Sequence, residues 1–222
     1  GDTLIPYEWV ESAINRDVVL MPTDLVRKGF DPGAGGDESV LLTRIGHKIT
    51  EIQTKNEPDT ERLKHWLLTE LLDEPNPFIF YLDPIGIGNH LYYWLESLDI
   101  PNMKRVWGVD VRYESNDITC FRLRDELFMK VRRDFETRTL SIPYDDELIG
   151  ELTTIRSTDP DSTKGKIKIE SKRELRNRGL NSPNKADALA LTYYFDDKYC
   201  QQIINSDKKK KKVIKEYNWR TL

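Results

Sequence analysis

Apolar residues follow two different patterns along the chain: short, nearly continuous runs, and residues spaced three or four positions apart. The first pattern predicts strands and the second predicts helices. Short runs of β-branched, aliphatic and aromatic residues predict the strands. A tight turn at Gly46 joins the second strand to the third, which favours an antiparallel hairpin. The fourth, PFIFYLD, is continuously apolar, as is typical of a strand buried on both faces. The strands are expected at residues 24–31, 38–46, 47–55, 77–83 and 103–111.

Apolar residues three or four positions apart predict the helices. The helix at 145–156 is expected to pass into a hairpin completed by residues 165–172. Three strands in hairpin succession, followed by alternating helices and strands, predict an α/β fold: a mixed sheet flanked by helices, with an added β-hairpin. The helices are expected at residues 7–15, 59–74, 86–100, 116–136, 145–156 and 181–197.

The length and composition of the chain limit its domain number, its relation to membranes and the metal ligands it can supply. A length of 222 residues suits one generous domain, and no apolar run approaches the roughly 20 residues that span a bilayer. Two cysteines and three scattered histidines offer neither a disulfide framework nor zinc-ligand spacing. Any bound metal is therefore expected to have carboxylate ligands.

The net charge of −4 hides two basic segments. Residues 208–222 carry seven basic residues and one acid, a local charge of +6, and residues 164–178 carry seven basic residues against two acids. Local patches of this kind can bind nucleic acid although the whole chain is acidic.

Three aspartates stand where carboxylates are usually disfavoured. Asp31 ends the first strand, Asp83 ends the apolar strand, and Asp187 shares a helix face with Ala190 and Leu191. A carboxylate on an apolar surface must be paired, protonated or bound to a metal. Few basic residues are near Asp31 and Asp83 in sequence, and strand ends meet at one rim of an α/β sheet. We therefore expect the three to converge.

The glycine-rich loop after Asp31 raises a choice between a phosphate cradle and a cation site. A phosphate loop of the GxxxxGK[ST] type needs a lysine and a hydroxyl, but here Asp37 and Glu38 follow the glycines. Because hard cations such as Mg²⁺ prefer oxygen ligands, the loop is interpreted as holding a cation, with Asp37 reaching the same rim. Two such ions, about 3.5–4 Å apart, can clamp a phosphodiester.

Each aspartate also has an ordinary explanation. Asp31 and Asp83 both precede proline, as in common turns, and Asp187 could pair with an arginine. Taken together, the three favour a metal site.

Alternate lysines along the predicted hairpin strand share one face, and the basic run continues beyond it. Such a face could contact DNA phosphates or be only solvated. Ser182 and Pro183 are expected to be the N-cap and first residue of the last helix. The candidate DNA-binding residues are Lys164, Lys166, Lys168, Lys172, Arg173, Arg176 and Arg178.

Three segments in this order, GFDPGAGGDESVLL, FIFYLDPIGIGNHLYYWL and IKIESKRELRNRGLNSPNKADALALTYYF, resemble the C-terminal nuclease domain of viral (tailed bacteriophage) large terminase subunits. The resemblance implies a ribonuclease H-like fold and Mg²⁺- or Mn²⁺-dependent, two-ion cleavage of double-stranded DNA during genome packaging. It implies catalytic, metal-binding roles for Asp31, Asp83 and Asp187, with Asp37 as a fourth ligand. The family commonly has Ser-Pro-Asp before its last helix, whereas Asn184 replaces that acid here.

The resemblance also implies domains and partners. The family's full-length subunit carries an ATPase, and no GxxxxGK[ST] occurs here. Residues 1–20 are thus expected to be a linker from the ATPase domain, 21–200 the nuclease domain, and 201–222 a basic tail. Further expected partners are the viral portal and the small terminase subunit. The protein is expected to act in the host cytoplasm and transiently at the procapsid portal, without contact with a membrane.

Two other functions remain open from sequence. A junction resolvase or integrase-like nuclease would share the acid cluster. A non-catalytic module that docks on DNA or the portal would use the acids only for stability. The lysine run 208–212 could bind DNA or the portal, or be a solubilising tail.

Overall fold

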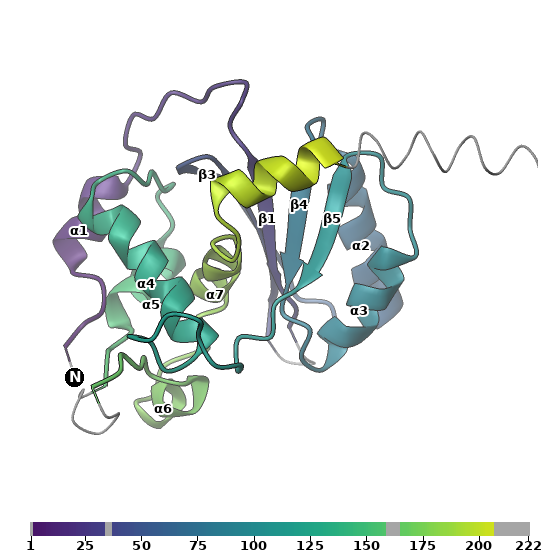
Figure 1. Ribbon diagram of the computed structural model, residues 1–222. Coiled ribbons are helices and arrows are strands. Elements are labelled where there is room, and N and C mark those ends of the chain that lie inside the picture. Colours follow the sequence, from purple (N-terminus) through teal and green to yellow (C-terminus); the bar gives the residue numbers. More distant parts are fainter. Residues whose placement is uncertain (1, 34–36, 159–164, 207–222) are drawn as a thin grey trace, which may run out of the picture.

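A five-stranded mixed sheet forms the centre of the molecule, seen here in a computed structural model that describes residues 2–33, 37–158 and 165–206 (Figure 1). The strand order is β3-β2-β1-β4-β5. The hairpin strands β2 and β3 run antiparallel to their neighbours, while β4 and β5 run parallel to β1. The mixed sheet is therefore confirmed. Its strands are β1 (Val26–Asp31), β2 (Ser39–Ile45), β3 (Lys48–Lys55), β4 (Phe78–Leu82) and β5 (Met103–Gly108).

Helices cover both faces of the sheet (Figure 1). One face carries α2 (Thr60–Leu72) and α3 (Ile87–Glu96), whose apolar residues pack with Phe30, Phe80 and Leu82 in one core cluster. The other carries α7, with α4, α5 and α1 outside it, over a second and larger cluster. The bounds on this side are α1 (Tyr7–Ala13), α4 (Leu123–Glu136), α5 (Asp146–Thr154), α6 (Lys172–Asn177) and α7 (Asn184–Leu191).

Both ends of the described chain pack onto this unit. Leu4, Ile5 and Val10 are buried in the larger core, so much of the segment expected to be a linker contributes to the domain. Residues 197–206 form a helix with Cys200 and Ile203 buried, so helical structure continues past residue 200, where the basic tail was expected to begin. The lysine run 208–212 lies outside the described residues.

Two elements differ from the sequence prediction. The helix expected from residue 116 begins at Leu123, because Asp125 accepts the backbone N–H of Arg122 at 2.8 Å and fixes the start there. Residues 116–122 are irregular apart from single bridges. The added hairpin is reduced to a short antiparallel pair in which Ser157 faces Ile169 and Thr158 N donates to Lys168 O at 2.7 Å.

Helix α7 lies unusually close to the sheet because of a glycine. A Cβ atom on Gly29, in β1, would be 2.0 Å from the carbonyl oxygen of Ala188 in α7. Only a residue without a side chain lets the two backbones approach in this way. The close contact brings Asp187, one residue earlier in α7, towards the end of β1.

Candidate functional site

The three aspartates line one cavity of about 840 Å³. Asp31 is the last residue of β1 and Asp83 directly follows β4, its parallel neighbour; Asp83 N donates to Phe30 O at 3.2 Å. Asp187 reaches the cavity from the first turn of α7. The structure thus brings Asp31 and Asp83 together at one rim of the sheet, as predicted, and adds Asp187 from α7 to the same cavity.

A lysine occupies the space between two of the carboxylates. Lys172 Nζ lies 3.3 Å from Asp31 Oδ2 and 3.1 Å from Asp187 Oδ2. Few basic residues are near Asp31 in sequence, but the fold supplies a basic partner from α6, 141 residues away in the chain. Its contact with the aspartates is one that the DNA-binding prediction for Lys172 did not anticipate.

Asp187 also has the arginine partner that the sequence left open. Arg124 Nη2 lies 3.0 Å from Asp187 Oδ1, and Arg124 Nε donates to the same oxygen at 3.2 Å. Arg124 Nη1 donates to Glu170 O at 2.6 Å, so the guanidinium is held at both ends. Sequence reasoning missed Arg124, which stands among other charged residues near the start of α4.

Burial and neighbouring charges shift the pKa values of the three aspartates in different directions. Burial raises the pKa of Asp31 to about 7, with Lys172 opposing the rise and the charges of Asp187 and Asp83 adding to it. Burial also raises the pKa of Asp83. Burial acts in the same direction on Asp187, but Arg124 and Lys172 outweigh it and hold the pKa of that carboxyl below its usual value.

The donor chemistry of this cluster fits a hard divalent cation, because carboxylate oxygens converge on a buried space that already holds a positive charge. Within residues 2–33, 37–158 and 165–206, however, no three His, Cys, Asp or Glu side chains stand close enough to hold a metal as they are. Lys172 Nζ lies between Asp31 and Asp187, so a cation bound by both of these carboxylates would have to displace it.

Asp37 does not line the cavity, and its side chain is exposed. The loop does fold back: Gly33 N donates to Ser39 Oγ at 2.9 Å, and a Cβ on Gly33 would be 2.0 Å from Asp37 O. Residues 34–36 lie outside the described chain. The metal-ligand role of Asp37 stays a prediction.

The predicted basic run divides into parts with different surroundings. Lys168 and Arg173 line the cavity, whereas Arg176 is exposed away from it. Arg178 Nη1 lies 2.5 Å from Glu170 Oε2 in an ion pair. Lys166 is half-buried, and Lys164 lies outside the described residues. The segment 172–177 is a helix, which the sequence analysis missed; the signal was Ser171 followed by Glu174, a reciprocal capping box.

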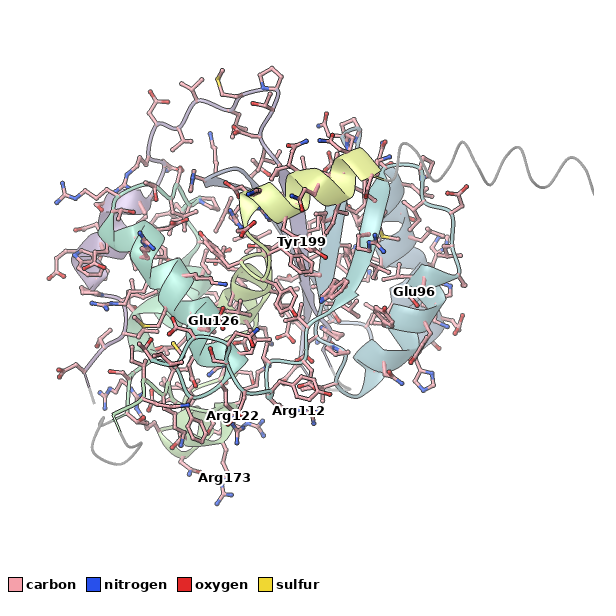
Figure 2. All side chains as sticks on the ribbon, in the orientation of Figure 1. Glu96, Arg112, Arg122, Glu126, Arg173 and Tyr199 are labelled. Atoms are coloured by element: carbon pink, nitrogen blue, oxygen red, sulfur yellow. The ribbon has the colours of Figure 1, made fainter. Side chains whose placement is uncertain are left out.

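Two exposed arginines that the sequence analysis did not single out complete the mouth of the cavity. Arg112 and Arg122 lie on the loop between β5 and α4 and line the cavity with Arg173. Figure 2 shows these three at the same end of the molecule. Arg112 is fixed by Asp110, to which Nε and Nη2 donate at 2.8 and 2.6 Å. The available signal was that Arg112 follows a strand parallel to β4, and so stands at the same rim.

The start of α7 differs from the prediction by one residue. Pro183 is the N-cap, not Ser182, and Asn184 is the first helical residue; no side chain of the cap accepts a hydrogen bond. A residue from α5 supplies an acceptor instead: Glu151 Oε2 accepts the N–H of Ala186 at 2.7 Å. Burial raises the pKa of Glu151 to about 8, despite that hydrogen bond.

Comparison with known proteins identifies the fold. No family model and no curated protein matches the chain. A variant gp2C of the large terminase subunit of bacteriophage Sf6, with calcium, matches 87% of this chain and 100% of its own at a TM-score of 0.72 and 17% identity. The large terminase nuclease of thermophilic phage G20c matches 88% of this chain and 100% of its own (0.63, 15%). The large terminase nuclease domain of Thermus phage P74-26 matches 84% and 93% (0.59, 16%).

These matches establish the expected ribonuclease H-like fold, in the form found in phage terminase nuclease domains. They extend over nearly the whole length of each solved domain. In the described part of the chain, no helix has the length and apolar character needed to cross a bilayer.

Proposed function

We propose that this chain is a metal-dependent endonuclease that cuts double-stranded DNA during viral genome packaging, as the nuclease domain of a large terminase subunit. The observation that carries the proposal is the convergence of Asp31, Asp83 and Asp187 on one cavity at the ends of β1 and β4, in a fold shared with terminase nucleases. An ATPase domain preceding residues 1–20, the portal and the small subunit are the corresponding partners, with action in the host cytoplasm and at the procapsid portal.

Divalent ions suit the site. Domains of this fold have been solved with manganese, magnesium and cobalt. In this chain, Asp31, Asp83 and Asp187 would hold two Mg²⁺ or Mn²⁺ ions, with Asp37 as a further ligand. Such a pair of ions activates a water molecule and stabilises the leaving oxygen of a phosphodiester.

The protein groups around the aspartates prepare them for this task. Asp31 has to lose its proton before it can act as a ligand, and burial places that step near neutral pH. Arg124 holds Asp187 through Oδ1. Lys172 neutralises Asp31 and Asp187 and has to withdraw when a divalent ion replaces its charge; phosphates at the cavity mouth would then attract it.

Basic side chains on two sides of the cavity suit a DNA backbone. Lys168 comes from the segment leading into α6 and Arg173 from α6 itself, while Arg112 and Arg122 come from the loop after β5. Neutralisation of phosphates by such residues is independent of base sequence. Of the remaining predicted contacts, Lys166 and Arg176 could extend the same surface and Lys164 could follow. Arg178 also pairs with Glu170, and its contact with DNA stays a prediction.

A plasmid-nicking assay with Mg²⁺, Mn²⁺ or a chelator tests the proposal. The unmodified chain should nick supercoiled DNA with at least one of the metals and not with the chelator. Asp31→Asn should abolish nicking while thermal unfolding shows a folded protein, and Asp73→Asn, on the exposed end of α2, should leave nicking unchanged. Metal-independent nicking, or full activity in Asp31→Asn, would refute the proposal. Preference for a four-way junction over plasmid and linear DNA would indicate a resolvase.

A further inference from the structure

We infer that Glu151 is a positioning residue for Asp187: its carboxyl group caps the start of α7 from a neighbouring helix and so fixes where the candidate metal ligand points. This inference rests on the proposed function. The hydrogen bond from Ala186 N to Glu151 Oε2, at 2.7 Å, joins α5 to the residue immediately before Asp187.

The first turn of α7 needs such a partner. The first N–H groups of any helix have no acceptor within the helix, and Pro183, the N-cap of α7, supplies none from a side chain. Asp187 N donates to Pro183 O at 2.8 Å, and Asn184 N donates to Ser182 O at 2.9 Å. Among the described residues, the acceptor for Ala186 N is Glu151 Oε2 from α5, and this carbonyl-type oxygen can accept the hydrogen bond whether or not the carboxyl group is protonated.

A second link from the same helix acts on the neighbouring residue. Lys185 is buried, and its Nζ lies 2.9 Å from Asp145 Oδ2 and 2.8 Å from Glu147 Oε2. Asp145 is itself the N-cap of α5, accepting Leu148 N at 2.8 Å. Two consecutive residues of α7 are therefore tied to α5 directly before Asp187.

The opposite side of α7 is fixed by the sheet. Gly29 brings β1 against Ala188, the residue after Asp187. With β1 on one side and Glu151 on the other, α7 can neither slide nor rotate without breaking a contact. The carboxylate of Asp187 is consequently held towards Lys172 and Arg124.

The surroundings of Glu151 indicate a role other than solubility. Its second oxygen, Oε1, is covered by protein and has no hydrogen-bond partner among the described residues. A buried carboxyl oxygen without a partner costs free energy, and the hydrogen bond that the other oxygen accepts from Ala186 N offsets this cost. An acid here is explained by the cap that it provides next to Asp187.

Two substitutions distinguish a capping role of the Glu151 side chain from a role in packing alone. Glu151→Leu keeps the size and removes the acceptor, while Glu151→Gln keeps an oxygen that can accept Ala186 N–H. We expect Mn²⁺ affinity, measured by titration calorimetry without DNA, to fall about tenfold in Glu151→Leu, as for other residues that orient metal ligands, and to stay near the parent value in Glu151→Gln. Glu61→Leu, on the exposed face of α2, is the matched control and should bind Mn²⁺ normally.

The nicking rate should follow the same pattern, with half-saturation by Mn²⁺ shifted about tenfold in Glu151→Leu. Parent-like Mn²⁺ affinity in a folded Glu151→Leu would overturn the inference, as would a loss in Glu151→Gln as large as in Glu151→Leu. If Glu151→Leu does not fold, Glu151→Asp, one methylene too short to reach Ala186 N, takes its place with the same expected loss. A parent chain that neither binds Mn²⁺ nor nicks DNA would refute the proposed function instead.

Discussion

The ammonium of Lys172 lies 3.1 Å from Asp187 Oδ2, and the same Nζ lies 3.3 Å from Asp31 Oδ2. One cation therefore joins the end of the central strand to the first turn of α7. It stands where a divalent ion shared by these aspartates would have to bind. A metal ion bound between these two aspartates would have to displace this charge.

Replacing that lysine should make the protein depend on metal. Lys172→Met leaves Asp31 and Asp187 with less counter-charge, so the metal-free protein should lose about 1–2 kcal/mol of stability, a partly exposed ion pair being worth less than a buried one. Added Mn²⁺ should then raise the melting temperature more in the variant than in the parent. Lys64→Met, which removes a pair with Glu61 and a contact with the Trp94 ring on the opposite face of the sheet, should leave the Mn²⁺-induced shift as in the parent. Equal Mn²⁺ shifts in Lys172→Met and the parent would contradict the competition.

Metal binding should weaken as pH falls through about 7. The pKa of Asp31 is raised to about 7, so its carboxyl is mostly protonated below that pH and must release a proton to act as a ligand. Between pH 5.5 and 7 the Mn²⁺ affinity should rise up to about tenfold per pH unit and level off above about pH 8. Calorimetry at pH 6 in buffers of different ionisation enthalpy should show release of about one proton. An affinity independent of pH from 6 to 8, with no proton released, would show that Asp31 is not a ligand.

A methyl group at Gly29 should disturb both the fold and the site. Gly29→Ala places a Cβ 2.0 Å from Ala188 O, so α7 has to move away from β1, at a cost of about 3 kcal/mol. The melting temperature should fall by roughly 6–12 °C, and nicking should weaken even at temperatures where the variant is folded. Gly150→Ala, in α5, meets no atom within 4 Å and should be neutral or slightly stabilising. Similar melting temperatures for the two variants would mean that α7 is not held as described.

Arginines at the cavity mouth should carry part of the salt dependence of DNA binding. Arg112→Ala and Arg173→Ala should each lower the slope of log K against log salt by about 1, because each loses one phosphate contact. Binding to a duplex is measured by fluorescence anisotropy with a chelator present, so that no cutting occurs. Arg62→Ala, exposed on α2 across the sheet, should leave the slope unchanged. If all three variants keep the parent slope, the DNA lies elsewhere.

The sheet and the proximity of Asp31 and Asp83 were predictable, because both follow from local patterns. Alternating and continuous apolar runs identify β1 to β5, and carboxylates at the ends of parallel neighbours must share a rim. The start of α4 was not predictable from apolar spacing alone, since residues 116–122 carry enough apolar residues to extend it; the cap at Asp125 decides the matter.

The partners of the aspartates were hidden for a different reason. Lys172 and Asp31 are 141 residues apart, and nothing in a local pattern specifies an ion pair over that distance. Arg124 and Glu151 look like ordinary charged residues on helix surfaces, and only the packing of α4, α5 and α7 gives them their contacts with Asp187 and its helix. Sequence therefore predicted which acids come together, while the charged residues that contact them and their helix required the structure.

Anomalous diffraction from crystals soaked in Mn²⁺ tests the shared-cation claim most directly. The account predicts at least one manganese peak in contact with carboxylate oxygens of Asp31 and of Asp83 or Asp187, with Lys172 Nζ moved away from its present position between Asp31 and Asp187. A manganese-free cavity at saturating metal, with Lys172 still paired to both aspartates, would contradict it.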